Sequence, residues 1–300
     1  MHSQPIMKRT LADMLLLVVW FIAASPVPAQ AAVPNMGPDR ERITVTCGDV
    51  ALLLRRRSQW TPGRIDFRGN PMTTERSAYG TVFSFPGVGF IGTAHLENEP
   101  EELTGLKFVL DGKELKAPGE SLSGKTFRFE RQSRVRSFGM TCEFELKKNR
   151  LFETTTVTAD EAAPLNLVYH FMHAWTPSVS AFLAGRDESS EASASGPLTD
   201  DKAVARKFYI NANVDWMAVY EPKSGQFAVS RLLEAPAEAG NISKIWNVPG
   251  TYRKFYLTCF QNQTLPAGFR GTWRMVTGFG SASPDSWKAA AMAMAAELRE

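Results

Sequence analysis

The chain has 300 residues, of which 44% are hydrophobic and 22% are charged, and its formal net charge at pH 7 is +3. No segment combines clustered Lys and Arg with interleaved aromatic residues, so a nucleic-acid groove is not expected. The densest basic run, Arg55–Arg57, suits a solvated loop or strand edge, where charge discourages aggregation.

The N-terminus predicts an export signal, assigned to residues 1–31. Met7–Arg9 supply a basic start, Met14–Ala24 form an apolar run, and Ala29–Ala31 give an A-x-A cleavage site. The run is shorter than the roughly 20 residues that cross a bilayer, and a retained anchor is the alternative. We expect an exported protein, periplasmic or secreted, that starts near Ala32 and has no stable membrane insertion after cleavage.

A linker at residues 32–42 precedes a single all-β domain, expected over residues 43–282. Short alternating segments separated by turn signals fill this range, and Lys125–Val135 is a clear example. Asp111-Gly112 between two β-forming runs is a hairpin signal. Nothing marks a second domain, and β-sandwiches can exceed 200 residues as one domain.

Cys47, Cys142 and Cys259 lie far apart in apolar or β-like contexts. An exported protein can form disulfides, but three cysteines allow at most one internal bridge, and its pairing stays open. Buried structural cysteines are favoured over a metal site. No metal and no cofactor are predicted.

The segment Pro164–Trp175 predicts a strand, because it is rich in aromatic and β-branched residues and has turn residues at both ends. His170 and His173 then point to opposite faces, since their separation is odd. In a helix they would lie side by side. One histidine is expected in a groove and the other in the core. A zinc site that adds His95 would need both on one side, which strand geometry opposes.

The segment Gly185–Ala205 is polar and acidic and has no apolar face, which predicts a mobile loop. Two interpretations remain, an insertion without a function or a cover over a binding groove.

The last residues, 283–300, predict a helix that packs on the domain. Ser283 suits the N-cap, Pro284 the first helical position, and Asp285 the positive end of the helix dipole. An apolar stripe follows at helical spacing, formed by Trp287, Ala291, Met294 and Leu298.

Three segments together resemble the aldose 1-epimerases, which have the galactose mutarotase-like fold. Asn166–His170, preceded by a proline, resembles the motif around their catalytic histidine. Trp60–Ile65 resembles the opening of such domains, and Tyr256–Phe269 resembles the region that carries their catalytic base. The resemblance implies a large antiparallel β supersandwich. It also implies that His170 is the general acid, which protonates the ring oxygen while a carboxylate removes the anomeric proton.

The chain departs from that family where the catalytic glutamate is expected. Cys259 and Gln261–Gln263 stand there, and an amide cannot serve as the base. Glu97 and Glu221 are left as candidate bases.

Seven residues are candidate substrate ligands. His95, next to several glutamates, suits proton transfer or an exposed loop. Tryptophan faces suit the C–H surface of sugars, and arginine presents paired donors to hydroxyl or carboxylate groups. The set comprises Arg64, His95, Trp175, Trp246, Tyr252, Arg253 and Gln261.

The expected partner is a carbohydrate, and three functions are compatible with the sequence. The protein could be an epimerase-like enzyme, a non-catalytic carbohydrate-binding envelope protein, or a polysaccharide lyase-like enzyme. A carboxylate within reach of His170 favours the first, and its absence with exposed aromatic residues favours the second. An open His–Tyr–Arg cluster favours the third. The identity of the sugar and the oligomeric state stay open.

Overall fold

The computed structural model of the protein describes residues 41–75, 80–95, 98–116, 118–187, 192–201 and 208–299, which all belong to one compact unit. The predicted export signal and most of the predicted linker lie outside these residues. None of the helices in the described ranges is long and apolar enough to cross a membrane.

The strands form one large sheet and three smaller ones. The large sheet has ten strands, in the spatial order β16 (Ala192–Pro197), β15 (Ala181–Gly185), β18 (Trp216–Glu221), β19 (Gln226–Glu234), β23 (Arg270–Ser281), β12 (Arg150–Ala159), β11 (Phe138–Lys147), β10 (Thr126–Val135), β7 (Glu102–Leu110) and β8 (Lys113–Leu115).

The six-stranded sheet has the order β17 (Phe208–Ala212), β20 (Ile242–Val248), β21 (Tyr252–Cys259), β14 (Leu167–Trp175), β5 (Val82–Phe85) and β6 (Gly89–Gly92). The five-stranded sheet has the order β4 (Asn70–Pro71), β3 (Pro62–Phe67), β2 (Val50–Arg55), β1 (Arg42–Cys47) and β9 (Ser121–Gly124). The smallest sheet pairs β13 (Ala163–Leu165) with β22 (Gln263–Leu265). Helical turns of the 3₁₀ type occur at Arg56–Ser58 and Ala237–Ala239.

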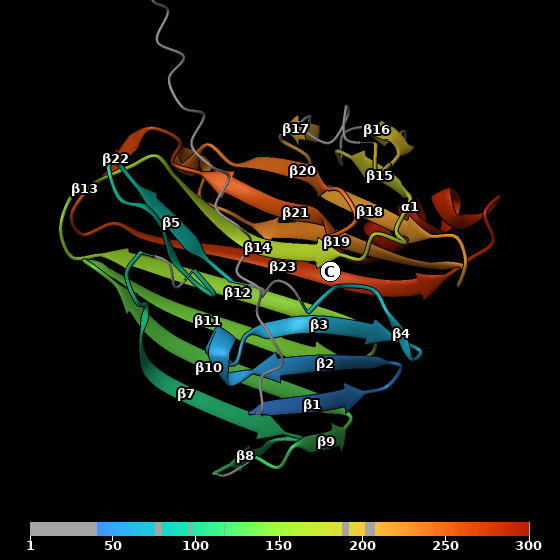
Figure 1. Cartoon of the computed structure of the whole chain (residues 1–300), viewed down its shortest axis with the longest axis horizontal. Helices are drawn as coiled ribbons and strands as arrows, with labels where there is room; N and C mark the ends of the chain where they lie inside the picture. Colours follow the sequence, from blue (N-terminus) through green and yellow to red (C-terminus); the bar gives the residue numbers. More distant parts are fainter. Residues whose placement is uncertain are drawn as a thin grey trace, which may run out of the picture. The chain divides into compact units, whose positions relative to one another are not determined.

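The five-stranded and six-stranded sheets both pack against the inner face of the ten-stranded sheet (Figure 1). Phe67 of β3 stacks on Phe279 of β23, with ring centroids 5.9 Å apart. Phe83 of β5 stacks on Phe138 of β11 at 4.7 Å. The core therefore fills the space between the large sheet and the two smaller ones.

The alternation of apolar and polar residues determines which face of the large sheet joins the core. Along β10, β11 and β12, buried side chains alternate with more exposed ones, so that one face of the sheet joins the core and the other meets solvent. The hairpin predicted at Asp111-Gly112 is also present, and its two residues have φ values of 48° and 79°, as a type I′ turn requires.

All three cysteines are buried free thiols.

The expectation of a loop without structure over Gly185–Ala205 is wrong in its central part. Ala192–Pro197 forms β16, which pairs with β15. Leu198 is buried in the core, and the Asp200 carboxylate accepts a hydrogen bond from Arg253 at 2.6 Å. Sequence reasoning missed this strand because its residues are small and polar. It is held by pairing with β15 and by the buried side chain of Leu198.

The expected C-terminal helix is present as α1 (Trp287–Glu297), which begins three residues after Pro284. Trp287 stacks on Tyr220 of β18 with ring centroids 4.9 Å apart, and Ala291 and Leu298 are buried beside it. The helix covers the outer face of β18, β19 and β23 (Figure 1). The outer face of β10, β11 and β12 stays accessible to solvent.

Candidate functional site

Both histidines of β14 point towards the ten-stranded sheet. The His170 ring packs against Trp273 of β23, and His173 contacts Glu153 of β12. The pairing of β14 with β21 shifts register between the two histidines, where Phe171 has a φ of 54°. A bulge adds one residue to a strand, so two residues with an odd separation can lie on the same face. The prediction that the two histidines point to opposite faces is therefore wrong.

His170, the predicted general acid, has an exposed fraction of 0%. Its Nδ1 lies 2.9 Å from Thr81 Oγ1, and its ring centroid lies 4.3 Å from that of Trp273. Nε2 has no hydrogen-bond partner among the described residues. Burial lowers the pKa of His170 to about 3, so the imidazole is neutral at physiological pH. In this position the side chain does not meet a ligand from solvent.

His173 joins a buried hydrogen-bond network. Its Nε2 lies 2.7 Å from Glu153 Oε2, and its Nδ1 lies 3.3 Å from Ser230 Oγ. Ser230 Oγ is in turn 2.9 Å from Thr277 Oγ1. The order of groups matches a Ser–His–Glu relay, but the adjoining cavity has a volume of about 10 Å³, enough for one water at most. The network connects β14 with three strands of the large sheet.

The two predicted bases do not meet His170 among the described contacts. Glu97 lies outside the described residues. Glu221 ends β18, where its carboxylate accepts hydrogen bonds from the backbone of Lys223 and from the backbone and hydroxyl of Ser224. Partial burial raises the pKa of Glu221, but the bonds from Ser224 and Lys223 outweigh it and lower the pKa. This carboxylate organises a turn.

Two of the predicted ligands, Arg64 and Arg253, are bound by other groups of the protein. Arg64 on β3 contacts the carboxylates of Asp66 and Glu75, each at 2.8 Å. Arg253 is 3% exposed and donates to the Val179 carbonyl at 3.1 Å, in addition to its bond with Asp200. Both guanidinium groups are thus engaged within the protein.

The three predicted aromatic ligands differ in exposure. Trp175 and Tyr252 are 2% and 5% exposed and belong to the packed interior. Trp246 is half-buried, in register with Phe208 and Lys254 of the neighbouring strands. Another predicted ligand, Gln261, lies in the turn after β21 and donates to Thr258 Oγ1 at 3.4 Å.

His95 contacts a residue that sequence reasoning missed. Its Nε2 lies 2.6 Å from the Tyr169 hydroxyl, and the Nζ of Lys254 lies over the rings of Tyr169 and Tyr256, at 4.7 Å and 4.9 Å from their centroids. Burial lowers the pKa of Lys254 to about 8. The cluster lies on the outer face of the six-stranded sheet, but Tyr169 is only 3% exposed.

A second missed group is the buried ion pair of Arg131 and Glu101, at 2.9 Å. Arg131 Nη1 also donates to Gln59 Oε1 at 2.8 Å, and Glu101 accepts from the Ser133 hydroxyl at 2.6 Å. The signal was in the sequence, because Arg131 occupies an inward position of the alternating strand Lys125–Val135. The ion pair is buried, as the two histidines are.

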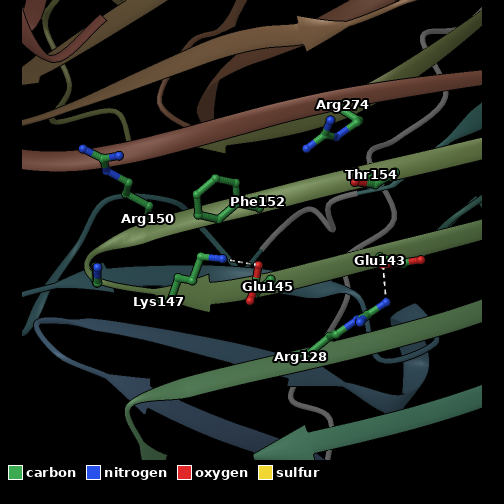
Figure 2. A pocket seen from close by; sticks show the side chains of 9 residues that line it. Arg128, Glu143, Glu145, Lys147, Arg150, Phe152, Thr154 and Arg274 are labelled. Atoms are coloured by element: carbon green, nitrogen blue, oxygen red, sulfur yellow. Dashed lines mark hydrogen bonds and ion pairs between the residues drawn. The ribbon is translucent and has the colours of Figure 1, made fainter. Parts of the chain in front are cut away.

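The accessible candidate site is a pocket of about 600 Å³ on the outer face of β10, β11, β12 and β23, which we name the sheet-face pocket (Figure 2). Apart from Lys148, which lies in the turn between β11 and β12, its side chains come from outward positions of neighbouring strands, so the strand register brings them together. The lining residues are Arg128, Glu143, Glu145, Lys147, Lys148, Arg150, Phe152, Thr154 and Arg274.

Phe152 is the one aromatic ring among the described lining residues. It packs against the apolar cluster under α1, which leaves it half-buried at the border between the covered and uncovered parts of the sheet. Figure 2 shows the ring between Arg150 and Arg274, with Lys147 nearby. The Lys147 ammonium lies 4.8 Å from the ring centroid. An apolar surface is thus surrounded by charged hydrogen-bonding groups.

Two ion pairs order the polar part of the sheet-face pocket. Arg128 pairs with Glu143 at 2.5 Å, and Lys147 pairs with Glu145 at 2.7 Å (Figure 2). Sequence reasoning missed these residues because the outward positions of a strand look like ordinary solvated surface. Only the pairing of four strands shows that they converge.

Comparisons with solved structures show a galactose mutarotase-like fold. A galactose mutarotase-like protein from Lactobacillus casei is 10% identical, with 80% of this chain and 100% of that chain covered and a TM-score of 0.51. The Slr1438 protein from Synechocystis is 10% identical over 82% and 98% of the two chains, with a TM-score of 0.50. The galactosidase domain of an alpha-galactosidase-sucrose kinase is 6% identical over 80% and 40%, with a TM-score of 0.51.

These similarities confirm the predicted fold class, a large antiparallel β supersandwich with a short C-terminal helix. No protein-family model matches the sequence, and no curated protein matches it.

Proposed function

We propose that the protein is an exported, non-catalytic carbohydrate-binding protein and that its ligand lies in the sheet-face pocket. The observation that carries the proposal is the half-buried Phe152 ring, bordered by arginines, lysines and two carboxylates in a pocket of about 600 Å³. An aromatic face packs on the C–H surface of a sugar, while paired charged groups bind its hydroxyls. The fold it shares with a galactose mutarotase-like protein supports the same ligand class.

Binding without catalysis is favoured over epimerisation by the surroundings of His170. Its contacts in the described part of the chain are with Thr81, Phe171 and Trp273, and none is a carboxylate. An epimerase needs a base opposite its acid, and both must reach the sugar. Exposed aromatic residues, the second expected mark of a binding protein, occur at Phe90 and Phe208, but both lie outside the sheet-face pocket and do not support a site there.

A lyase has less support. The described His–Tyr pair, His95 with Tyr169, has a lysine over the tyrosine ring in place of the expected arginine, and the tyrosine is almost fully buried. Export remains part of the proposal, supported by the sequence of residues 1–31.

Isothermal titration calorimetry with a panel of neutral and acidic oligosaccharides tests this function. Wild-type protein should bind at least one of them, and Phe152→Ala should weaken that binding about tenfold or more, since the stacking surface is lost. Phe208→Ala is the matched control, because Phe208 is an exposed phenylalanine on β17 outside the pocket. Folded protein that binds no oligosaccharide, or a Phe152→Ala variant that binds like wild type, would contradict the proposal.

A further inference from the structure

The sheet-face pocket has more positive than negative charge. Among the described lining residues, five side chains are cationic and two are carboxylates. The carboxylates of Glu143 and Glu145 are already paired with Arg128 and Lys147. The surplus therefore lies on the three remaining cations, Lys148, Arg150 and Arg274.

These three cations have weak partners or none among the described residues. Arg150 Nη2 lies 3.4 Å from Glu297, and Arg274 Nη1 lies 3.7 Å from Glu234. Both carboxylates lie outside the pocket lining and are more than half exposed, and such pairs contribute little. Within the described ranges, Lys148 has no carboxylate at ion-pair distance. Each guanidinium keeps further N–H groups for a ligand.

The surplus cations lie on both sides of the aromatic ring. Arg150, Phe152 and Thr154 occupy successive outward positions of β12, and Arg274 is the register partner of Thr154 on β23. Outward positions repeat about every 7 Å along a strand, so Arg150 and Arg274 are separated by about 14 Å in that direction. Figure 2 shows the two arginines flanking the Phe152 ring. This spacing suits a chain with repeated negative charges better than a single one.

We propose that the ligand of the sheet-face pocket is an anionic oligosaccharide with a carboxylate or sulfate group on successive sugars. One sugar ring packs on Phe152, and the charges of its neighbours contact Lys148 and Arg150 at one end and Arg274 at the other. Arginine binds carboxylate and sulfate through two parallel N–H donors, which fixes the orientation of the chain as well as its charge. This inference rests on the proposed carbohydrate-binding function and specifies its ligand class.

The test titrates the full folded protein at low salt with four probes of similar length. These are an oligogalacturonate, a sulfated dextran oligosaccharide, a neutral malto-oligosaccharide and polyglutamate. The acidic sugars should bind about tenfold or more tightly than the neutral one, and about tenfold or more tightly than polyglutamate, which lacks a sugar ring. The carboxylated and sulfated probes distinguish the two sources of charge. High salt should weaken the binding of the acidic sugars more than that of the neutral one, because exposed charges are screened.

The triple variant Lys148→Gln/Arg150→Gln/Arg274→Gln removes the surplus charge and keeps Phe152. Its affinity for the acidic sugar should fall about tenfold or more. Its affinity for the neutral sugar should stay within about twofold of the wild-type value. The control Lys113→Gln/Lys223→Gln/Lys288→Gln removes the same charge from positions outside the pocket lining and should match wild type.

Two results would overturn the inference and leave the carbohydrate function intact. One is equal, Phe152-dependent binding of neutral and acidic sugars, and the other is a triple variant that binds acidic sugar like wild type. Polyglutamate that binds as tightly as oligogalacturonate would reject a sugar-specific site. The absence of any oligosaccharide binding would reject the proposed function itself.

Discussion

His173 Nε2 lies 2.7 Å from Glu153 Oε2 in the interior, with side chains 0% and 2% exposed. This contact joins the central strand of the six-stranded sheet to the centre of the ten-stranded sheet. Polar groups that are buried together in this way stabilise a fold only while both are present. The contact identifies His173 as a structural residue of the interior.

Replacing His173 with Ala should lower the free energy of unfolding by about 2–4 kcal/mol, because it leaves the Glu153 carboxylate buried without its partner and opens a cavity. Chemical denaturation of the variant measures this change. The double variant with Glu153→Ala should lose less than the sum of the single variants, since the two side chains interact directly. Lys107→Ala is the control, because it breaks only the exposed pair with Glu114 and should cost under about 1 kcal/mol. Additive effects of His173 and Glu153 would contradict the coupling.

His170 should make stability depend on pH. Its folded pKa of about 3 lies below the ordinary value of 6.5, so the unfolded chain takes up a proton first as the pH falls. The stability that the neutral histidine contributes is complete above about pH 6.5 and declines progressively towards pH 3, by about 2 kcal/mol at pH 5. The variant His170→Gln lacks this titration, so its melting temperature should fall less than that of wild type between pH 7 and pH 5. Parallel declines in the two proteins would show that His170 is protonated in the folded state.

Deleting Gly185–Ala205 should destabilise the protein. Sequence reasoning alone predicts that the fold tolerates this deletion, but the structure places β16, the buried Leu198 and the Asp200–Arg253 ion pair within it. The cost should be several degrees in melting temperature, measured by thermal denaturation. Leu198→Ala alone should reproduce about 2 kcal/mol of the loss through its cavity. An unchanged melting temperature in the deletion variant would show that the segment contributes nothing to packing.

Export predicts a defined N-terminus. Mass spectrometry of the protein recovered from the periplasm or the medium should show a chain that starts near Ala32. A product that keeps Met1 or Met7 and sediments with membranes would contradict cleavage.

Much of the fold could be predicted because burial follows a period of two over long stretches. Phe127 and Phe129 alternate with polar residues, and the Asp111-Gly112 turn has a strong local signal. The bulge at Phe171 could not be predicted, because a single extra residue leaves the composition of the strand unchanged. The bulge turns the His173 side chain to the same face as His170. The predicted arrangement, with one histidine in a groove and the other in the core, is therefore wrong.

The candidate site was harder to predict than the fold. Arg128, Glu145 and Phe152 lie on three different strands, and none carries a motif. Their convergence depends on which strands pair and in which register, and this is set by tertiary packing. The position of Arg253 depends on tertiary packing in the same way. Arg253 has the right chemistry for a ligand, but its donors are directed at backbone carbonyls of a neighbouring loop.

We propose that the carbohydrate binds at the sheet-face pocket and not beside His170. Titration of the same oligosaccharide into folded Phe152→Ala and His170→Gln at pH 7 compares the two places directly. The Phe152→Ala variant should lose about tenfold or more in affinity. His170→Gln should bind like wild type and lose only stability, by about 1–3 kcal/mol. Full binding by Phe152→Ala together with loss of binding in folded His170→Gln would contradict the account and return the site to the interior histidine.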